Sequence, residues 1–432
     1  MLFKLVNGVS TCIGGGKLKF AEVAVAGWWR GNTHARLFIR SGLRGGRGGL
    51  HSRNRYPYCN CALTRSRTVH GSLRHFLLPT SFKLTNIANK LSKMTLKGCL
   101  KRTCCITSSF FAIILFLVFI IIPIVFRYSP SLQRGMIFLN YVRIPAVVNY
   151  SHPENYGIKG ANNFYIKTFD NITLGVWHIL PGNLLKKYDE DKSSYERLLS
   201  NGEPIVIYMH GNSGTRANEH RVQLYHVLQK INCHVIAVDY RSYADSTDVE
   251  VSESGVVSDA MEVFKWTHER ANGSPIFGWG HSLGTGISAH AYSLLEKEGL
   301  YPNGLILEAP FTKMSDEIRE YPLTKIHRML PWFEFFIIEP VVENNIIFDT
   351  ETNLMNTKMP ILILHAKDDV VIPYKLGEKL YTHLLKTRQN AKTEIVLYDQ
   401  HYKYGHKYIC KDEELGNRTW KFIQDSLENS SQ

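Results

Sequence analysis

The sequence predicts an α/β fold, with a mostly parallel central sheet flanked by helices, preceded by one membrane-spanning helix. Three observations lead to this prediction. Residues 104–126 form a run of 23 positions without a charged side chain. After residue 160, short apolar runs alternate with longer amphipathic stretches. A serine flanked by glycines, Ser282, follows directly after one of these apolar runs.

The predicted strands are short runs rich in Val, Ile and Leu. Six of them are expected over residues 205–210, 234–239, 276–281, 304–308, 360–365 and 394–398. Amphipathic helices are expected between them, for example over 252–270 and 374–386. Continuous apolar strands separated by helices indicate a parallel sheet that is covered on both faces. Two earlier runs, 163–169 and 172–178, are predicted to be antiparallel leading strands.

The positive charge of the chain is confined to its N-terminal part. The whole chain of 432 residues has a formal net charge of +13. Residues 1–103 contain 19 Lys and Arg but one acidic residue, whereas the remaining 329 residues contain 32 basic and 37 acidic residues. An enzyme that acts on nucleic acid usually carries its positive charge on the folded domain. We therefore exclude nucleic acid as a substrate or partner.

These patterns divide the chain into four parts. Residues 1–103 are predicted to be a basic, mostly disordered tail, because they are Gly/Arg-rich and show no sustained helical or strand period. Residues 104–126 are predicted to span the membrane, since a helix of this length measures about 35 Å and the hydrocarbon core about 30 Å. Residues 127–160 are a linker and lead-in, and 161–428 the folded domain, with a cap insertion near 311–350.

The flanking charges and the glycosylation sequons predict the orientation of the span. Several basic residues, from Lys90 to Arg102, precede the span, but Arg127 alone follows it closely. The positive-inside rule then places the N-terminus in the cytoplasm and the folded domain in the lumen or outside the cell. The sequons Asn-x-Ser/Thr agree, because none precedes the span. They lie at Asn149, Asn171, Asn272, Asn417 and Asn429.

Ser282 is the candidate nucleophile. It is the centre of Gly280-His-Ser-Leu-Gly284, between an apolar run that ends at the motif and a stretch of small residues that begins a helix. A sharp turn from strand to helix exposes a serine in this way and needs glycines on both sides. This context predicts a nucleophile elbow, the alternative being an ordinary structural turn.

An acid and a base are expected later in the chain, because serine needs a base to take its proton. The acid follows the strand at 360–365, where Asp369 is preferred to Asp368 because Asp-x-x-Ile-Pro is the usual acid turn of hydrolases. The base is predicted to be His406, which follows Gly405 in the loop after the last strand. The other histidines of this region are His383 and His401.

Acyl transfer also requires backbone N–H groups that bind the oxyanion. One donor is expected to be Leu283, the residue after the nucleophile. The second is expected in the loop that follows the strand at 205–210, with Asn212 as the donor and Gly211 beside it. A phosphate-binding loop is the competing interpretation of this glycine-containing turn, but no Gly-Lys-Ser/Thr follows it. No metal or organic cofactor is implied, because side chains and water suffice for this chemistry.

Together these stretches resemble the lysophosphatidylserine and monoacylglycerol lipase branch of the α/β-hydrolase-domain family. The resemblance covers roughly residues 100–425. The stretches that carry it are Tyr208-Met-His-Gly-Asn-Ser-Gly214, Val238-Asp-Tyr-Arg241, Trp279-Gly-His-Ser-Leu-Gly-Thr-Gly286, Leu305-Ile-Leu-Glu-Ala-Pro-Phe311, Leu362-Ile-Leu-His-Ala-Lys-Asp-Asp369 and Tyr404-Gly-His-Lys-Tyr408.

The resemblance implies an α/β-hydrolase fold with Ser282, Asp369 and His406 as the triad. It also implies a single-pass endoplasmic-reticulum protein of lipid metabolism, with a lumenal catalytic domain that hydrolyses lysophosphatidylserine and monoacylglycerol. The sequons predict that this domain is a glycoprotein. One departure concerns substrate preference, since the family tends to have Gly-x-Gly where this chain has Ser242-Tyr-Ala244. The alternatives from other classes are a protein thioesterase or depalmitoylase and a non-catalytic membrane scaffold.

Overall fold

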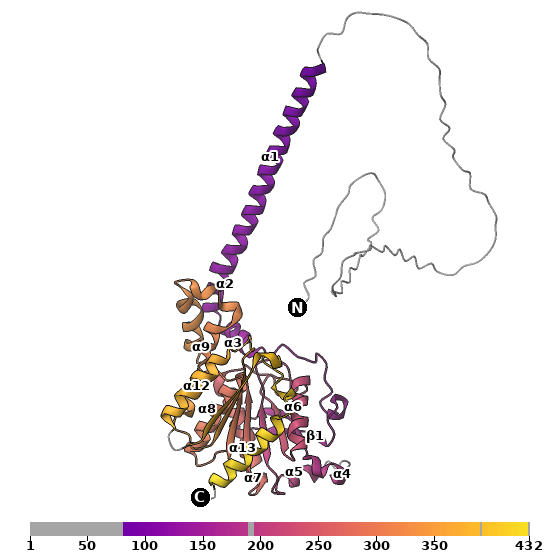
Figure 1. Ribbon diagram of the computed structural model, residues 1–432, viewed down its shortest axis with the longest axis vertical. Coiled ribbons are helices and arrows are strands. Elements are labelled where there is room, and N and C mark those ends of the chain that lie inside the picture. The colour runs from indigo at the N-terminus through magenta and orange to yellow at the C-terminus, as the bar shows by residue number, and fades with distance from the viewer. Residues whose placement is uncertain (1–80, 189–193, 389–390, 431–432) are drawn as a thin grey trace, which may run out of the picture. The chain divides into compact units, whose positions relative to one another are not determined.

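The computed structural model describes residues 81–188, 194–388 and 391–430 (Figure 1). The strands are β1 (Ala161–Lys167), β2 (Thr173–Ile179), β3 (Ile205–Met209), β4 (His234–Asp239), β5 (Ile276–His281), β6 (Gly304–Glu308), β7 (Ile361–Ala366) and β8 (Thr393–Tyr398). The α-helices are α1 (Ser81–Phe116), α2 (Ile122–Arg127), α3 (Pro130–Phe138), α4 (Leu185–Tyr188), α5 (Tyr195–Leu198), α6 (Glu219–Lys230), α7 (Glu253–Ala271), α8 (Leu283–Lys297), α9 (Met314–Glu320), α10 (Glu339–Glu343), α11 (Thr350–Leu354), α12 (Tyr374–Thr387) and α13 (Leu415–Ser430).

The eight strands form one sheet in the order β1-β2-β4-β3-β5-β6-β7-β8. From β4 to β8 all neighbouring strands are parallel, whereas β1 and β2 pair antiparallel at one edge. The prediction of a mostly parallel sheet with two antiparallel leading strands is therefore confirmed. The predicted bounds of β4, β5 and β6 match the observed ones at both ends.

Apolar cores lie on both faces of the sheet. Along β3, Ile205, Ile207 and Met209 point into one core and Val206 and Tyr208 into the other. The first core is shared with α7, α8 and α12, and the second with α6 and α13. This burial on both faces explains why the strands are apolar at every position, since side chains alternate between the faces of a strand.

The N-terminal helix is longer than the predicted span. Helix α1 begins at Ser81, so residues 81–103, which we expected to belong to an irregular tail, are helical. A π-helical turn, η1 (Leu117–Ile121), joins it to α2. Pro123, the second residue after this turn, lacks an N–H group and cannot continue the regular ladder of α-helical hydrogen bonds. Residues Asn89–Arg127 form one helix that is long and apolar enough to cross a membrane. The rest of the predicted tail, residues 1–80, lies outside the described residues.

The predicted linker, residues 127–160, contains structure of its own. Helix α3 lies within it, and its Phe138 is completely buried with its ring against that of Phe348. Further along, the carbonyl oxygen of Val142 accepts the N–H of Gly214 at 2.7 Å. The lead-in is thus packed against the folded domain, because its apolar residues supply part of the core.

The expected cap insertion lies between β6 and α11. It contains α9, two short 3₁₀ turns (Pro322–Thr324 and His327–Met329), a π-helical turn η7 (Glu334–Ile338) and α10. The aromatic run within it is divided between interior and surface, since Phe333 and Ile338 are buried and Phe335 is exposed.

Candidate active site

Ser282 occupies a strained turn between β5 and α8. Its backbone has φ 55° and ψ −121°, a conformation that side-chain-bearing residues rarely adopt. The flanking glycines permit the turn, because a Cβ on Gly284 would lie 2.0 Å from the carbonyl oxygen of Met209 and one on Gly280 would lie 2.5 Å from Ser288 Oγ. The Ser282 N–H donates to the carbonyl oxygen of Glu308 at 2.9 Å, which ties the turn to β6.

His406 connects Ser282 to Asp369. Its Nε2 lies 2.9 Å from Ser282 Oγ, and its Nδ1 lies 2.7 Å from Asp369 Oδ2. A carboxylate accepts a hydrogen bond, so Nδ1 carries the proton of the neutral imidazole. Nε2 is then left as the acceptor for the serine hydroxyl. The three side chains that the sequence singled out therefore form one hydrogen-bonded series, in which a base can withdraw the serine proton.

Asp369 is held as a buried carboxylate. Its Oδ1 accepts the backbone N–H groups of Val371 at 2.8 Å and Ile372 at 3.0 Å. Burial would raise the pKa of Asp369, but the neighbouring His406 and His365 outweigh it and lower the pKa far below its usual value. The group is thus ionised at neutral pH and is able to stabilise an imidazolium on His406.

The neighbouring Asp368 has a different contact. Its Oδ2 accepts the N–H of Gly405 at 3.0 Å, so it holds the loop that carries His406. This contact joins residues 37 positions apart and depends on the packing of two loops, so the sequence alone does not predict it. His401 is exposed and bonds to Asp399 at 2.7 Å, whereas His383 lies on α12.

The two expected oxyanion donors belong to segments that adjoin Ser282. Leu283 N–H begins helix α8, where the first amides have no acceptor within the helix. Within the described residues, neither this N–H nor that of Asn212 has a hydrogen-bond acceptor. Gly211 faces the nucleophile directly, because a Cβ added to it would lie 3.1 Å from Ser282 Cβ. The loop after β3 therefore adjoins the serine.

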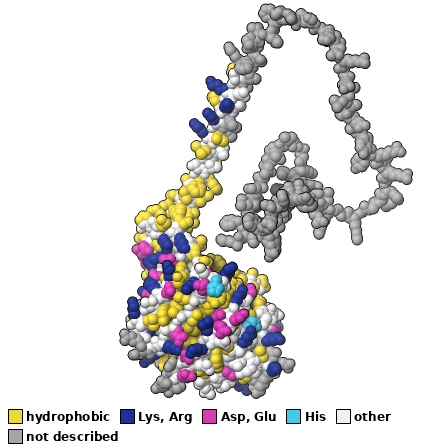
Figure 2. All heavy atoms as spheres, in the orientation of Figure 1, with side chains coloured by type: hydrophobic (Ala, Val, Ile, Leu, Met, Phe, Trp, Pro, Cys, Tyr) yellow, Lys and Arg dark blue, Asp and Glu magenta, His cyan; other side chains and the backbone are white. Residues whose placement is uncertain are grey.

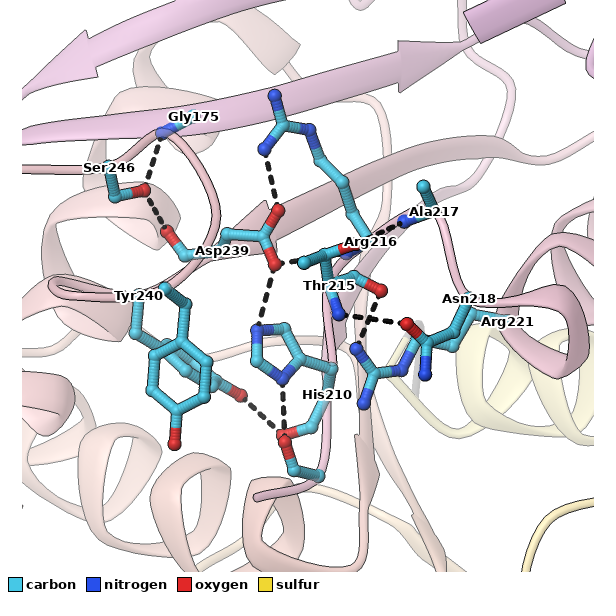
Figure 3. Close-up of polar contacts among 12 residues, drawn as sticks. Gly175, His210, Thr215, Arg216, Ala217, Asn218, Arg221, Asp239, Tyr240 and Ser246 are labelled. Carbon is cyan, nitrogen blue, oxygen red and sulfur yellow. Dashed lines mark hydrogen bonds and ion pairs between the residues drawn. The ribbon is translucent and has the colours of Figure 1, made fainter. Parts of the chain in front are cut away.

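A buried polar network holds this loop (Figure 3). His210 Nε2 lies 3.1 Å from Asp239 Oδ1, and Arg216 Nη1 donates to Asp239 Oδ2 at 2.6 Å. Arg221 donates to the carbonyl oxygens of Thr215 at 2.7 Å and of Ser213 at 2.6 Å. Figure 3 shows His210 between Asp239 and the loop backbone, where His210 Nδ1 donates to the carbonyl oxygen of Gly211 at 2.7 Å. Most polar atoms of these side chains are paired, which rigidifies the loop, although Arg216 Nε and Arg221 Nε have no hydrogen-bond partner within the described residues.

Residues 242–244, where the chain departs from the Gly-x-Gly pattern of the family, form a loop beside the site. Ser242 and Ala244 have positive φ angles of 66° and 52°, where glycine is favoured. Between them, Tyr243 donates from its hydroxyl to the carbonyl oxygens of Phe138 and, at 3.3 Å, of Asn212. A change in this loop therefore acts next to the expected oxyanion donor.

Two histidines of the site were not identified from the sequence. His281 precedes the nucleophile, and its Nε2 donates to the carbonyl oxygen of His406 at 2.8 Å. Burial, together with the nearby His406, lowers the pKa of His281, so it is neutral. His365 lies at the end of β7 with Nε2 3.5 Å from Asp369 Oδ2. The sequence does place each of these histidines near a predicted triad residue. It does not show which atom the histidine contacts.

Carboxylates other than Asp369 also lie near the site. Glu308 at the end of β6 is buried and accepts the indole N–H of Trp279 at 2.9 Å, and burial raises its pKa to about 7. Glu317 on α9 is half-buried, and burial together with the charge of Asp369 raises its pKa to about 8. The charge of Asp369 therefore affects Glu317 on helix α9 of the cap.

The candidate glycosylation sites and the two cysteines of the domain are also placed. Four of the sequon asparagines are exposed, namely Asn149, Asn171, Asn272 and Asn417. The side chain of the fifth, Asn429, lies outside the part of the chain that the structure describes. Cys233 and Cys410 are buried free thiols, so the structure does not join them.

Comparison with known proteins identifies the family. Residues 201–349 match the family model described as "Serine aminopeptidase, S33". "Lysophosphatidylserine lipase ABHD12" of Danio rerio is 36% identical over 310 residues, covering 71% of this chain and 81% of that protein. The Xenopus tropicalis protein of the same name is 38% identical over 325 residues, covering 74% and 83%. Human "Protein ABHD12B" is 36% identical over 284 residues, covering 65% and 77%. The chain therefore belongs to the ABHD12 family of α/β-hydrolases.

Proposed function

We propose that this chain is a membrane-anchored serine hydrolase that cleaves the acyl esters of lysophospholipids, lysophosphatidylserine in particular, and of monoacylglycerols. The observation that carries the proposal is the hydrogen-bonded series Ser282–His406–Asp369, which brings a hydroxyl, an imidazole and a carboxylate to the carboxyl ends of parallel strands. The substrate class rests on the lysophosphatidylserine lipases of Danio rerio and Xenopus tropicalis, which match more than two thirds of the chain.

The reaction begins with a proton transfer. His406 Nε2 takes the proton of Ser282 as Oγ attacks the ester carbonyl carbon. The N–H groups of Leu283 and Asn212 bind the oxyanion that forms on the carbonyl oxygen. Asp369 keeps Nδ1 protonated and stabilises the imidazolium.

An acyl-enzyme then forms and is hydrolysed. The bond between the carbonyl carbon and the glycerol oxygen breaks, and His406 returns its proton to that leaving oxygen. Water enters, and His406 removes one of its protons as the water oxygen attacks the acyl carbonyl carbon. The bond from that carbon to Ser282 Oγ then breaks, His406 returns the proton to Oγ, and the fatty acid is released. Each half of the cycle uses the same donors and the same base.

The proposed location is the endoplasmic-reticulum membrane, crossed once, with the N-terminus cytoplasmic and the hydrolase domain lumenal. Support comes from the basic residues that precede the span and from four exposed sequons after it. In Figure 2, basic side chains lie toward one end of α1 and hydrophobic ones toward the other. We expect a removable glycan on Asn149, Asn171, Asn272 or Asn417, measured as a mobility shift after glycosidase treatment.

Lipid hydrolysis by the full chain in membranes tests the function. Ser282→Ala is expected to abolish fluorophosphonate labelling and hydrolysis of lysophosphatidylserine and monoacylglycerol. Ser293→Ala, a buried serine on the same helix whose hydroxyl donates to the carbonyl oxygen of His290, is the matched control and should retain both. Labelling that persists without Ser282 contradicts the assignment of the nucleophile. Hydrolysis of acyl-cysteine peptides but of neither lipid would favour the thioesterase alternative.

A further inference from the structure

The cap carries a row of exposed apolar side chains next to the membrane helix. Leu323, Ile326 and Met329 are 75%, 64% and 84% exposed. They lie at intervals of three residues in a segment built of two 3₁₀ turns. A 3₁₀-helix has three residues per turn, and Lys325 and Ile326 between the two turns keep right-handed helical angles, so the three apolar side chains lie along one edge. Such an edge facing water would be unfavourable, because it leaves contiguous apolar surface hydrated.

This segment contacts the membrane helix at a residue within the apolar run. His327 lies between Ile326 and Met329, its Nε2 is 3.3 Å from the carbonyl oxygen of Val118, and its ring centroid is 5.2 Å from that of Phe119. Phe119 precedes Arg127, the first charged residue after the run, by eight positions. At 1.5 Å per residue the contact is about 12 Å deeper along the helix than Arg127.

A second contact fastens the other end of the cap to the end of the membrane helix. The Arg127 guanidinium lies over the ring of Phe335, 3.9 Å from its centroid, and donates to the Phe335 carbonyl oxygen. It also pairs with Glu339 at 3.5 Å and Glu343 at 3.2 Å. Two contacts about 12 Å apart along one helix determine how the segment lies against it.

The cations of the segment are compatible with a bilayer. Arg328 is paired with Glu320 at 3.2 Å and donates to the Arg319 carbonyl oxygen at 3.0 Å. Lys325 is exposed, and a lysine has a stem long enough to reach the headgroup region while its neighbours remain in the acyl chains. Interfacial segments commonly combine apolar residues with lysine and arginine in this way.

We propose that residues 321–338 form a second membrane contact, in which Leu323, Ile326 and Met329 enter the leaflet that surrounds the C-terminal end of the membrane helix. The segment follows α9, which begins three residues after Phe311, and Phe311 packs over the start of α8, because a Cβ added to Gly286 would lie 3.1 Å from its Cζ. A lipid acyl chain then passes from the bilayer along this edge toward Ser282. The delivery of substrate rests on the proposed lipid hydrolase function, whereas the membrane contact does not.

The contact itself is tested with tryptophan as a depth probe in the full chain, reconstituted in phosphatidylcholine vesicles. Met329→Trp adds fluorescence that should be quenched by lipids brominated in their acyl chains and protected from aqueous acrylamide. Tyr301→Trp is the control, because Tyr301 precedes β6 and so lies toward the amino ends of the parallel strands, whereas the site lies at their carboxyl ends. Its added fluorescence should show the reverse pattern. Quenching of Met329→Trp by acrylamide but not by brominated lipid overturns the proposal.

The delivery step is tested with a double variant and two substrates. Leu323→Ser/Met329→Ser should lower kcat/KM for lysophosphatidylserine in vesicles by roughly tenfold, since membrane affinity scales with buried apolar area, and should leave a water-soluble short-chain ester within about twofold. Tyr301→Ser/Leu385→Ser is the matched control, with side chains 48% and 49% exposed, and should change neither rate.

The outcomes separate the two proposals. An equal loss on both substrates would assign the segment a structural role and overturn the delivery step. Unchanged hydrolysis of the vesicle substrate would overturn it too. If the wild type hydrolyses no lipid ester while Met329→Trp is quenched from within the bilayer, the proposed function fails and the membrane contact stands.

Discussion

Nε2 of His406 lies 2.9 Å from Oγ of Ser282, although 124 positions separate the two residues in the chain. The serine is fixed by the turn between β5 and α8. The histidine belongs to a loop that Asp368 and Asp369 hold from the end of β7. The distance between base and nucleophile therefore depends on two carboxylates that lie far from both residues in the sequence.

The two carboxylates are expected to differ in effect. Asp369→Asn should lower kcat about 10³–10⁴-fold, because the amide no longer selects the tautomer or stabilises the imidazolium. Asp368→Ala removes only the acceptor of the Gly405 N–H and should cost at least tenfold less than that, as an order-of-magnitude expectation for a positioning contact. Steady-state rates on a soluble ester measure both, and equal losses would contradict the assignment of Asp369.

Gly284, the second glycine of the nucleophile motif, should tolerate no side chain. Gly284→Ala places a Cβ 2.0 Å from the Met209 carbonyl oxygen, so the backbone of α8 has to move away from β3. We expect a loss of about 3 kcal/mol or more in the free energy of unfolding. Gly135→Ala in α3 is the control, because its nearest neighbour is a Tyr141 ring atom at 3.9 Å. It should be neutral or stabilising by up to about 1 kcal/mol. Similar denaturation curves for the two variants would contradict the close packing at Gly284.

The two residues with positive φ angles near the oxyanion loop, Ser242 and Ala244, should respond differently to replacement by glycine. Ala244→Gly should raise the free energy of unfolding by about 1 kcal/mol, because alanine is strained at φ 52° and its methyl group forms no compensating hydrogen bond. Ser242→Gly should give no gain, because Ser242 Oγ accepts the Val249 N–H and bonds to Asp248, each at 3.0 Å. Chemical denaturation of both variants measures the difference. A gain for Ser242→Gly alone would show that its hydrogen bonds do not offset the strain.

Glu308 makes stability depend on pH in the direction opposite to that of most carboxylates. Burial raises its folded-state pKa from 4.5 to about 7, so between these values the unfolded chain releases a proton that the folded chain keeps. This contribution favours folding below pH 4.5 and is lost as the pH rises to about 7. Glu308→Gln removes it while leaving an oxygen to accept the Trp279 N–H.

Denaturation of the wild type and Glu308→Gln at pH 4.5 and pH 8 measures the effect. The stability of the variant relative to wild type should increase by up to about 3 kcal/mol between these two pH values. The difference at any single pH is not decisive, because the substitution also changes packing. A relative stability that is the same at both pH values would mean that Glu308 is not titrating in a raised range.

Most strands could be read from the sequence because burial on both faces makes them apolar throughout. The bounds of β4, β5 and β6 followed from this pattern alone. Helix α3 was missed, since a short apolar stretch next to the span reads as a linker until its Phe138 is seen inside the core. The helical residues 81–103 were missed because they contain no sustained apolar period.

The sequence by itself determined the order of the elements, the apolar span, and the serine, carboxylate and imidazole that follow three strands. These are local properties, encoded in side chains that are neighbours along the chain. Only the tertiary structure decided that Asp368 holds Gly405, that His281 donates to the His406 carbonyl, and that His327 of the cap touches Val118. Such contacts join residues that are 37 to 209 positions apart, and their geometry follows from strand order and loop packing rather than from local propensity.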